Sequence, residues 1–274
     1  MKLNNIAITG SASFIGKCLL EKLSGKYTII SLNRSNGGDI RNPESFSDIS
    51  ADLVIHLAAI TRSQKHEEMF DTNVNGTLNV LEFCKKTGAR LIFASSASVY
   101  GDTHKSPIKE DSKLNPVSFY GLTKTFAEAL CEFYHKEFNL DVTILRVFNL
   151  YGPGQKKGVL IPDLLEKIEK GEEISIKNPF AVRDFVYVED VADAIVKSMN
   201  LEGLNKINIG TGKKRTVEYA ARILTGENIK LEDREGGKSI SYANIIRAKK
   251  LLEWEPKTSL EDGLKETMMY THKK

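Results

Sequence analysis

The stretch Ile6-Ala-Ile-Thr-Gly-Ser-Ala-Ser-Phe-Ile-Gly16 decides the fold class, because a short apolar run leads through a glycine-containing turn into a helical pattern. Ile15, Leu19 and Leu23 recur at helical spacing and predict a helix over residues 14–23. A strand, a turn and a helix in this order predict the first βα unit of a parallel sheet.

This turn has features of a phosphate-binding loop, although it is poor in glycine. Gly10 can make the tight turn, and Gly16 allows the helix to pack closely against the strand. The first helical turn, with Phe14 and Ile15, would offer N–H groups and a positive dipole end to a pyrophosphate. Ser13 stands where a middle glycine would let the backbone approach the phosphates, and its hydroxyl could bond a phosphate oxygen instead. We interpret all five as cofactor-binding residues; the alternative is a turn of an α/β protein that binds no phosphate.

Apolar runs alternate with helix-period segments through the first half of the chain. Further strands are predicted over residues 27–32, 53–57, 91–93 and 142–147, and further helices over 72–86 and 120–136. Near-continuous apolar strands separated by helices are typical of a parallel sheet that is covered on both faces, which is the doubly wound α/β arrangement of a Rossmann fold. We therefore predict a nucleotide-binding domain over residues 1–149.

Beyond Tyr151 the elements become shorter, and glycine and charged residues increase. Helices are predicted over residues 160–170, 188–199, 216–224, 244–252 and 259–268, with a short strand over 207–209. We predict that residues 185–209 return to the sheet and that residues 150–274 mainly form a small C-terminal α/β lobe.

The composition argues against several classes of partner. The 274 residues carry a net charge of +3, and the lysines are scattered, so the chain has neither a nucleic-acid stripe nor a basic membrane helix. No apolar run is long enough to cross a bilayer, and a strand beginning by Leu3 leaves no room for a signal segment. Cys18, Cys84 and Cys131 lack the spacing of metal ligands. We expect a cytoplasmic protein that binds no nucleic acid, no membrane and no metal.

The end of the second predicted strand bears on the choice of cofactor. The run Ser31-Leu-Asn-Arg-Ser35 has no acidic residue, which in NAD-binding proteins grips the adenosine ribose. Asn33 and Arg34 stand at this tip, and an arginine here can receive the 2′-phosphate of NADP. The expected cofactor is NAD or NADP, with Arg34 favouring NADP; the alternative is a solvated arginine.

A tyrosine and a lysine four residues apart form the most informative pattern in the middle of the chain. Tyr120 and Lys124 would share one face of a helix, and the pair Ser95-Ser96 follows a predicted strand. A cation beside a phenol lowers the pKa of the phenol, and a serine hydroxyl can hold the oxygen whose proton the phenolate takes. These side chains predict proton transfer at a carbinol, whereas the spacing alone also arises by chance on amphipathic helices.

Further segments give these patterns a common context. They are Gly38-Asp-Ile-Arg41, Val54-Ile-His-Leu-Ala-Ala59, Thr72-Asn-Val-Asn-Gly-Thr77, Ser95-Ser-Ala-Ser-Val-Tyr-Gly101, Arg146-Val-Phe-Asn-Leu-Tyr-Gly-Pro153, Arg183-Asp-Phe-Val-Tyr-Val-Glu-Asp190 and Ala248-Lys-Lys-Leu-Leu-Glu-Trp-Glu-Pro256. In number and order they resemble the extended short-chain dehydrogenases/reductases of the NAD(P)-dependent nucleotide-sugar epimerase/dehydratase family, over almost the whole chain. The resemblance implies an enzyme with a Rossmann domain followed by a substrate-binding lobe.

The resemblance also implies a role for each residue of the middle segment. Tyr120 would be the acid/base residue, and Lys124 would lower its pKa and bond the nicotinamide ribose. Ser96 matches the catalytic serine of the family better than Ser95 does. Further cofactor contacts would come from Asn33, Arg34, Asp39, Ile40, Leu57, Ala58 and Ala59.

Substrate contacts would involve a nucleotide sugar. The matching positions are Ser96, Ser98, Tyr120, Asn149, Arg183 and Arg234. Arg183 would lie on the diphosphate, and Arg234 matches a second diphosphate arginine in a shortened part of the lobe. The alternative for Arg183 is a surface ion pair with Asp184.

The residues after Ser96 limit the reaction. Sugar 4,6-dehydratases of the family carry an Asp-Glu pair there, whereas this chain has Ala97-Ser98 and no acid or base for the elimination. The expected function is redox chemistry at sugar C4 of the UDP-sugar 4-epimerase type; one alternative is an NADPH-dependent reductase of a nucleoside-diphosphate 4-keto-6-deoxysugar. A third reading is an NADP-binding sensor without turnover. The helices over 72–86 and 120–136 resemble those of a four-helix dimer interface, so a homodimer is expected.

Overall fold

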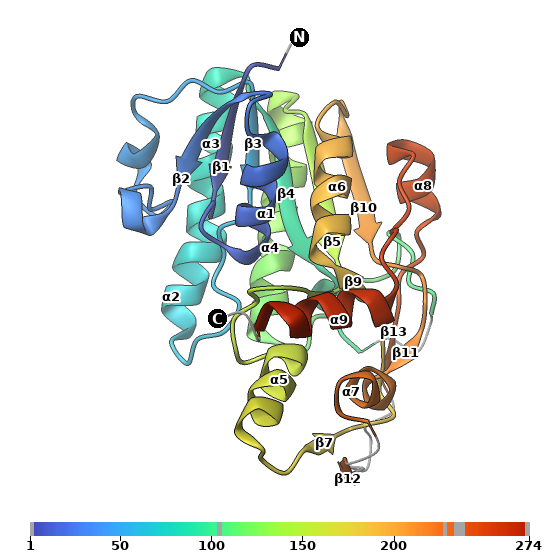
Figure 1. The fold of residues 1–274 in the computed structure, drawn as a ribbon. Coiled ribbons are helices and arrows are strands. Elements are labelled where there is room, and N and C mark those ends of the chain that lie inside the picture. The colour runs from blue at the N-terminus through green and yellow to red at the C-terminus, as the bar shows by residue number, and fades with distance from the viewer. Residues whose placement is uncertain (1–2, 103–105, 227–228, 233–238, 272–274) are drawn as a thin grey trace.

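A six-stranded sheet forms the centre of the computed structural model, which describes residues 3–102, 106–226, 229–232 and 239–271. Its strands are β1 (Asn5–Thr9), β2 (Thr28–Leu32), β3 (Leu53–His56), β4 (Arg90–Ser96), β5 (Val142–Val147) and β10 (Leu204–Ile209). They lie in the order β10-β5-β4-β3-β1-β2, and every adjacent pair is parallel (Figure 1). The chain changes direction between β1 and β3, which flank the switch point where α/β proteins of this kind bind ligands.

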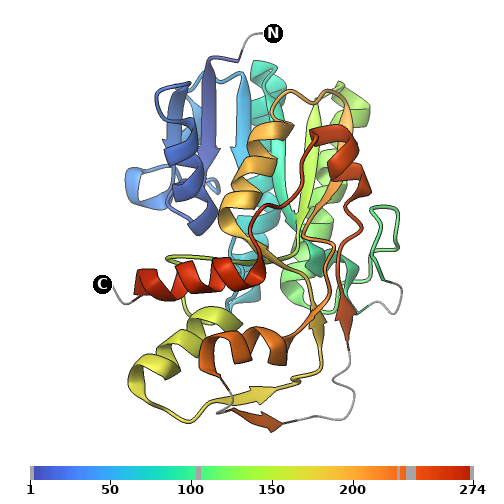
Figure 2. The ribbon, with the colours of Figure 1, turned by 45° about the vertical axis from the view of Figure 1, so that its right-hand side comes forward.

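Helices cover both faces of this sheet (Figure 2). Helices α1 (Phe14–Leu23), α6 (Val188–Ser198) and α8 (Ile246–Leu252) pack on one face, and α3 (Gly76–Thr87) and α4 (Phe119–Phe138) on the other. Ile6 and Ile8 belong to the core under the first set, while Ala7 and Val54 belong to the core under the second. Strands buried on both faces must be apolar throughout, so the doubly wound α/β prediction is confirmed. In the described ranges, no helix combines the length and the apolar character needed to cross a membrane.

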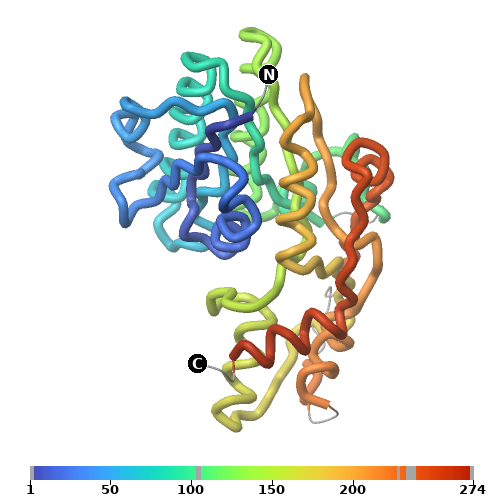
Figure 3. Tube along the Cα trace, turned by 45° about the horizontal axis from the view of Figure 1, so that its top comes forward, coloured from blue at the N-terminus to red at the C-terminus, as the bar shows by residue number. Residues whose placement is uncertain are grey.

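A smaller group of elements lies beyond the carboxyl ends of the central strands (Figures 1 and 3). Helices α5 (Leu160–Lys170), α7 (Val217–Thr225) and α9 (Leu260–Thr271) share an apolar cluster that includes Leu164, Ala220 and Leu264. The short strands are β6 (Asn149–Tyr151) with β9 (Phe185–Tyr187), β7 (Ser175–Lys177) with β12 (Lys230–Glu232), and β11 (Arg215–Thr216) with β8 (Val182–Arg183) and β13 (Ile240–Ser241). Between them, the chain returns to the central sheet as β10, beside β5.

One predicted helix begins differently in the structure. The sequence predicts a helix over residues 72–86, but the structure has α2 (His66–Phe70), a π-helical turn η3 (Asp71–Asn75) and then α3. The buried amide of Asn73 in this turn donates to the carbonyl of Ile60 at 2.9 Å and to the hydroxyl of Thr123 at 3.0 Å. These bonds satisfy a buried polar group that regular helix periodicity does not predict, which explains the wider turn.

Candidate active site

The turn between β1 and α1 has no room for a side chain at two positions. Gly10 has a φ of +67°, and a Cβ on this residue would lie 2.7 Å from the backbone nitrogen of Ala58. At Gly16, a Cβ would lie 2.5 Å from the carbonyl oxygen of Ser11. Gly10 thus brings the turn against the segment after β3, and Gly16 brings α1 against the turn. A bare backbone at the end of β1 fits the close approach of a pyrophosphate.

Ser13 begins α1 and serves the helix itself. Its hydroxyl oxygen accepts a hydrogen bond from the N–H of Gly16 at 3.1 Å, so Ser13 is the N-cap. The same hydroxyl keeps its hydrogen for donation. With the N–H groups of Phe14 and Ile15 in the first helical turn, Ser13 forms a set of donors suited to a phosphate.

Asn33 and Arg34 stand at the tip of β2, as expected, but their side chains differ in surroundings. The Asn33 amide donates to the hydroxyl of Ser11 at 3.0 Å and so ties the tip of β2 to the β1–α1 turn. Asn33 also caps the 3-10 helix η1 (Arg34–Asn36). Arg34 is largely exposed, with its guanidinium 3.9 Å from the carboxylate of Glu68.

Asp39 and Ile40 follow on the same side of the sheet. The carboxylate of Asp39 forms an ion pair of 2.5 Å with Arg41, and this hydrogen bond holds the pKa of Asp39 below its ordinary value. Ile40 is buried and fills the space where Gly76 has no side chain, since a Cβ there would lie 2.6 Å from Ile40 Cδ1. Asp39 therefore presents a charged group, and Ile40 an apolar wall, beside the end of β2.

The segment Leu57-Ala-Ala59 continues from the end of β3 past the β1–α1 turn. The N–H of Leu57 donates to the carbonyl of Thr9 at 3.1 Å, which extends the pairing of β3 with β1. Ala58 and Ala59 are half-buried, and Ala58 touches Gly10 closely. The structure therefore brings the expected cofactor residues of β1, β2 and β3 to one edge of the sheet, at the switch point.

Ser96 and Tyr120 meet where β4 ends and α4 begins. Ser96 is the last residue of β4, and its hydroxyl accepts from the N–H of Ser98 at 3.1 Å and donates to the hydroxyl of Ser98 at 3.0 Å. Tyr120 lies in the first turn of α4 and is half-buried. Burial raises the pKa of Tyr120 to about 12, and a side-chain hydrogen bond with Ser96 acts in the opposite direction. The phenol is thus protonated at neutral pH.

Lys124 is buried one turn further along α4. Its ammonium donates to the carbonyl of Ala94 at 2.7 Å and lies 4.5 Å from the ring centroid of Phe93. Burial lowers the pKa of Lys124 to about 8. The ammonium lies 5.9 Å from the ring centroid of Tyr120, and the pKa of Tyr120 is raised rather than lowered. Burial dominates the pKa of Tyr120 in this structure, and the ammonium of Lys124 is directed to the carbonyl of Ala94.

Ser95 and Ser96 point to different partners. The Ser95 hydroxyl donates to the carboxylate of Glu128 at 2.5 Å, inside the protein. Successive residues of a strand face opposite sides of the sheet, so only one of the two serines can serve a site beside Tyr120. The structure brings Ser96 to that position.

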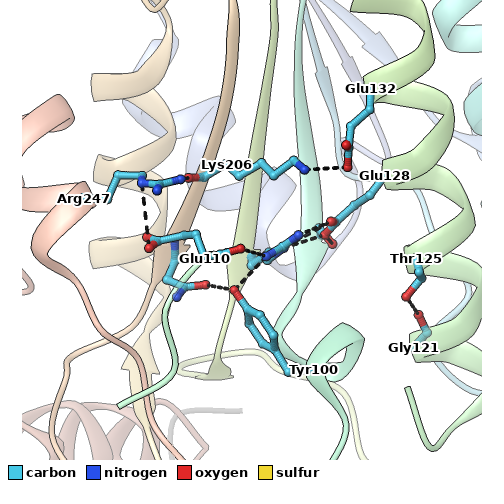
Figure 4. Close-up of polar contacts among 11 residues, drawn as sticks. Tyr100, Glu110, Gly121, Thr125, Glu128, Glu132, Lys206 and Arg247 are labelled. Atoms are coloured by element: carbon cyan, nitrogen blue, oxygen red, sulfur yellow. Dashed lines mark hydrogen bonds and ion pairs between the residues drawn. The ribbon is translucent and has the colours of Figure 1, made fainter. Parts of the chain in front are cut away.

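A buried ion pair behind this site was not anticipated from the sequence. Arg146 in β5 donates to the carboxylate of Glu128 in α4 through three contacts of 2.6 to 3.1 Å. It also donates to the hydroxyl of Tyr100 at 2.9 Å and to the carbonyl of Glu110 at 2.8 Å. Figure 4 labels these three partners: Glu128 lies in α4, Tyr100 in the short helical turn after β4, and Glu110 in the loop before α4. An arginine inside the apolar run of β5 is the signal that could have revealed it.

Two expected substrate residues stand where the smaller group of elements meets the sheet. The Asn149 amide, at the beginning of β6, donates to the carbonyl of Asp184 at 3.3 Å. Arg183 in β8 is half-buried, and its guanidinium donates to the carbonyls of Val182 at 2.9 Å and Ser239 at 3.2 Å. Burial lowers the pKa of Arg183.

The alternative for Arg183, an ion pair with Asp184, is not what the structure shows. The carboxylate of Asp184 is buried and accepts hydrogen bonds from the backbone of Thr211, Gly212 and Ala243. Arg183 keeps its guanidinium for neighbouring carbonyls instead. Arg234, the other expected diphosphate arginine, lies outside the described residues.

A cavity of about 470 Å³ opens beside Tyr120. The segment after β3 and the beginnings of α2 and α4 line it with Thr61, Arg62, Ser63, Gln64, His66, Met69, Ser118, Phe119 and Tyr120. The segment 61–64 was not expected to contribute to the site, since no motif marks it. In the part of the chain that the structure describes, no cluster of His, Cys, Asp or Glu is placed to hold a metal ion.

Known proteins of similar sequence and fold bear on this site. The model of the NAD dependent epimerase/dehydratase family matches residues 6–210. The chain is 35% identical to a UDP-glucuronate 4-epimerase of Thermodesulfobacterium geofontis, with 82% of this chain and 74% of that protein covered. It is 30% identical to UDP-glucuronic acid decarboxylase 5 of Arabidopsis thaliana, with 94% and 86% covered. The crystal structure of UDP-glucose 4-epimerase from Thermotoga maritima with UDP-glucose superimposes with a TM-score of 0.91, at 32% identity, covering 98% of this chain and 99% of that one.

The chain belongs to the NAD dependent epimerase/dehydratase family. Both the fold and the length of the match place it among the extended short-chain dehydrogenases/reductases, as the motifs indicated. The expectation of an enzyme with a nicotinamide cofactor is confirmed at this level.

Proposed function

We propose that this protein is a UDP-sugar 4-epimerase, which oxidises C4 of the sugar to a ketone and reduces it again with the opposite configuration. One observation carries the proposal: Ser96 at the end of β4 lies close enough to Tyr120 to lower the pKa of its phenol against burial, with Lys124 one turn further along α4. The family and its relatives named as 4-epimerases support it. Ala97 and Ser98, where dehydratases carry an acidic pair, argue against a 4,6-dehydratase.

Ser96 and Tyr120 would manage the proton at C4. The Ser96 hydroxyl would hold the C4 oxygen, the phenolate of Tyr120 would take the C4 hydroxyl proton on oxidation, and the resulting phenol would return it on reduction. When bound, the nicotinamide cofactor takes up hydride from C4 and gives it back. With the pKa of Tyr120 at about 12, forming the phenolate requires positive charge beside it, which is the role we propose for Lys124.

We propose that the two parts of the chain divide the ligands between them. Residues 1–149, with the returning residues 185–209, would hold the cofactor through Gly10, Ser13, Phe14, Ile15, Gly16, Asn33, Arg34, Asp39, Ile40, Leu57, Ala58 and Ala59. Residues 150–274 would mainly hold the nucleotide sugar, with Asn149 at the boundary and Arg183 on the diphosphate. Ser98, which is hydrogen-bonded to Ser96, would contact the sugar.

A second candidate function, the reduction of a 4-keto nucleotide sugar by NADPH, has one observation in its favour. Arg34 is largely exposed at the tip of β2, where it can turn from its long 3.9 Å contact with Glu68 to a 2′-phosphate. The purified protein should be denatured and the released nucleotide identified by mass. Retained NAD supports the epimerase, whereas an empty protein that oxidises NADPH with a 4-keto sugar supports the reductase.

The catalytic proposal is tested by Tyr120→Phe. This variant should retain its cofactor but lose epimerisation of UDP-glucose and UDP-glucuronate, because the proton acceptor at C4 is gone. Tyr27→Phe, a change at a tyrosine away from the site, serves as the control and should keep full turnover. Unchanged turnover in Tyr120→Phe would remove Tyr120 from the mechanism, and a wild-type protein that binds cofactor without turning over any nucleotide sugar would favour a sensor.

We also propose that the protein forms a homodimer through α3 and α4. Leu78 on α3 and Leu122, Phe126 and Phe133 on α4 are exposed. Phe70 packs edge-on against Phe126 with ring centroids 6.1 Å apart, and so extends the apolar area to α2. Two such helix pairs placed face to face would bury these side chains in a four-helix interface.

A further inference from the structure

Arg62 stands out among the arginines of the described residues, because it alone has no hydrogen bond and no ion pair. The others are engaged: Arg34, Arg41, Arg90, Arg146, Arg222 and Arg247 with carboxylates, and Arg183 and Arg215 with backbone carbonyls. A guanidinium has five donors in a planar fork, which matches a carboxylate or a phosphate. Arg62 is exposed, so its guanidinium is free to pair with an anion that enters the space beside Tyr120.

The surroundings of Arg62 include Tyr120 and the loop before α5. Arg62 lines the same 470 Å³ cavity as Tyr120. Gly158, from the loop before α5, lies against it, since a Cβ on Gly158 would lie 3.0 Å from Arg62 Nη1. The cavity wall contains no Asp or Glu, and the titratable side chains in it besides Arg62 are His66 and Tyr120.

Nearby charged groups do not neutralise Arg62. The carboxylate of Asp163 in α5 accepts the N–H of Gly158 at 2.5 Å, so it is occupied in holding the loop. His66 stacks on Phe119 with ring centroids 4.2 Å apart and carries no negative charge. The cavity beside Tyr120 thus has a permanent positive charge and no negative one.

We propose that Arg62 binds the carboxylate of a nucleoside-diphosphate uronic acid and gives the enzyme its preference for this substrate over the neutral hexose. The proposal rests on the proposed function, in which Tyr120 addresses C4 of the sugar. In a uronic acid the carboxylate is attached to C5, the carbon next to C4, so an anion site that shares a cavity with Tyr120 suits it. The diphosphate lies at the opposite, C1 side of the sugar ring, where we place Arg183.

The experiment compares holoenzyme variants on two substrates that differ only at C6. Turnover of UDP-glucuronate and UDP-glucose is measured by separating the products, and UDP binding is measured by calorimetry. The wild type should prefer UDP-glucuronate. Arg62→Met should lower kcat/KM for UDP-glucuronate on the order of 10- to 100-fold, the value of a charged hydrogen-bonded pair, while leaving UDP-glucose and UDP unchanged. The kcat/KM of Arg62→Lys for UDP-glucuronate should lie between those of the wild type and Arg62→Met, because lysine keeps the positive charge but lacks the planar fork of donors.

Lys65→Met is the matched control, since Lys65 is an exposed cation three residues along the same segment that does not line this cavity. It should leave the preference unchanged. An equal loss on both sugars, or weaker UDP binding in Arg62→Met, would place Arg62 on the diphosphate and overturn the proposal, as would a wild type that prefers UDP-glucose.

The proposed function and this inference can fail separately. If the wild type turns over neither sugar, calorimetry with UDP-glucuronate decides: binding at least tenfold weaker in Arg62→Met, with UDP binding unchanged, keeps the carboxylate site and rejects the epimerase. If the wild type instead converts UDP-glucuronate to a UDP-pentose with loss of CO₂, and Arg62→Met weakens this reaction, the carboxylate site is likewise kept and the epimerase is rejected.

Discussion

Replacing Lys124 with methionine should make the nucleotide-free protein more stable at neutral pH while it abolishes turnover. Lys124 is 3% exposed, and burial lowers its pKa from 10.5 to about 8. At about 1.4 kcal/mol per pKa unit, keeping this ammonium charged at pH 7 costs the folded state roughly 3 kcal/mol. Methionine has a similar length and carries no charge, so it removes this cost.

Part of the gain is offset by contacts that methionine cannot make. The ammonium of Lys124 donates to the Ala94 carbonyl at 2.7 Å and lies over the Phe93 ring. These contacts together contribute about 1 to 2 kcal/mol. We therefore expect Lys124→Met to raise the free energy of unfolding at pH 7 by about 1 to 2 kcal/mol.

The pH dependence identifies the cause. Because the pKa of Lys124 is lower in the folded than in the unfolded state, the unfolded chain binds more protons between pH 8 and 10.5, and wild-type stability gains from this group as pH rises. Below pH 8 the cost is fully present, and near pH 10.5 it is gone. The advantage of Lys124→Met should therefore be largest at pH 7 and should shrink through this window.

The assay is urea unfolding followed by the fluorescence of Trp254, the single tryptophan, which is buried. Lys26→Met, a change at an exposed lysine, is the control and should stay within about 0.5 kcal/mol of the wild type at every pH. A Lys124→Met protein less stable than the wild type at pH 7, or a stability difference that is the same at pH 7 and pH 10, would refute the reasoning.

Two further predictions concern the helix that carries Tyr120. Arg146→Met should lower the free energy of unfolding by about 3 to 5 kcal/mol, because it leaves the buried carboxylate of Glu128 unpaired. In urea unfolding, the double variant Arg146→Met/Glu128→Leu should recover much of this loss, because it removes that carboxylate as well. A double variant no more stable than Arg146→Met would contradict this. Phe126→Glu with Phe133→Glu should give a monomer by light scattering at micromolar concentration, because both side chains belong to the exposed apolar face of α4, whereas a dimer of unchanged mass would exclude that face as the interface.

The sequence predicted the central sheet because its signals are local. Apolar runs and helical periodicity mark β1, α1 and β5, and each lies within a residue or two of its predicted range. The shift at β10 has a simple reason. The sequence indicated only residues 207–209, but this edge strand begins at Leu204, because its polar residues find partners there: Asn205 donates to the carbonyl of Glu202, and Lys206 forms an ion pair with Glu132.

The charged interior of the site could not be predicted in the same way. Whether Lys124 is directed to Tyr120 or to Ala94 depends on how deeply α4 sits against β4, which no spacing along the chain reveals. Arg62 likewise carries no motif, and only the fold places it in a cavity with Tyr120. The partners of these charged side chains come from segments that are distant in the sequence. The packing of helices against strands brings those segments together.

The two buried charges of α4 are connected through this packing. Glu128 lies one turn beyond Lys124, and its carboxylate receives Arg146 from β5 and Ser95 from β4. The ion pair thus fixes α4 against the two strands whose ends frame the site, and the negative charge of Glu128 raises the pKa of Lys124 against the larger lowering by burial. Burial disfavours the charged form of Lys124, but the ion pair between Glu128 and Arg146 holds α4 in place one turn away. Lys124 therefore stays near Tyr120. If this is correct, Arg146→Met should reduce turnover as well as stability, since Ser96 and Tyr120 lose their common support.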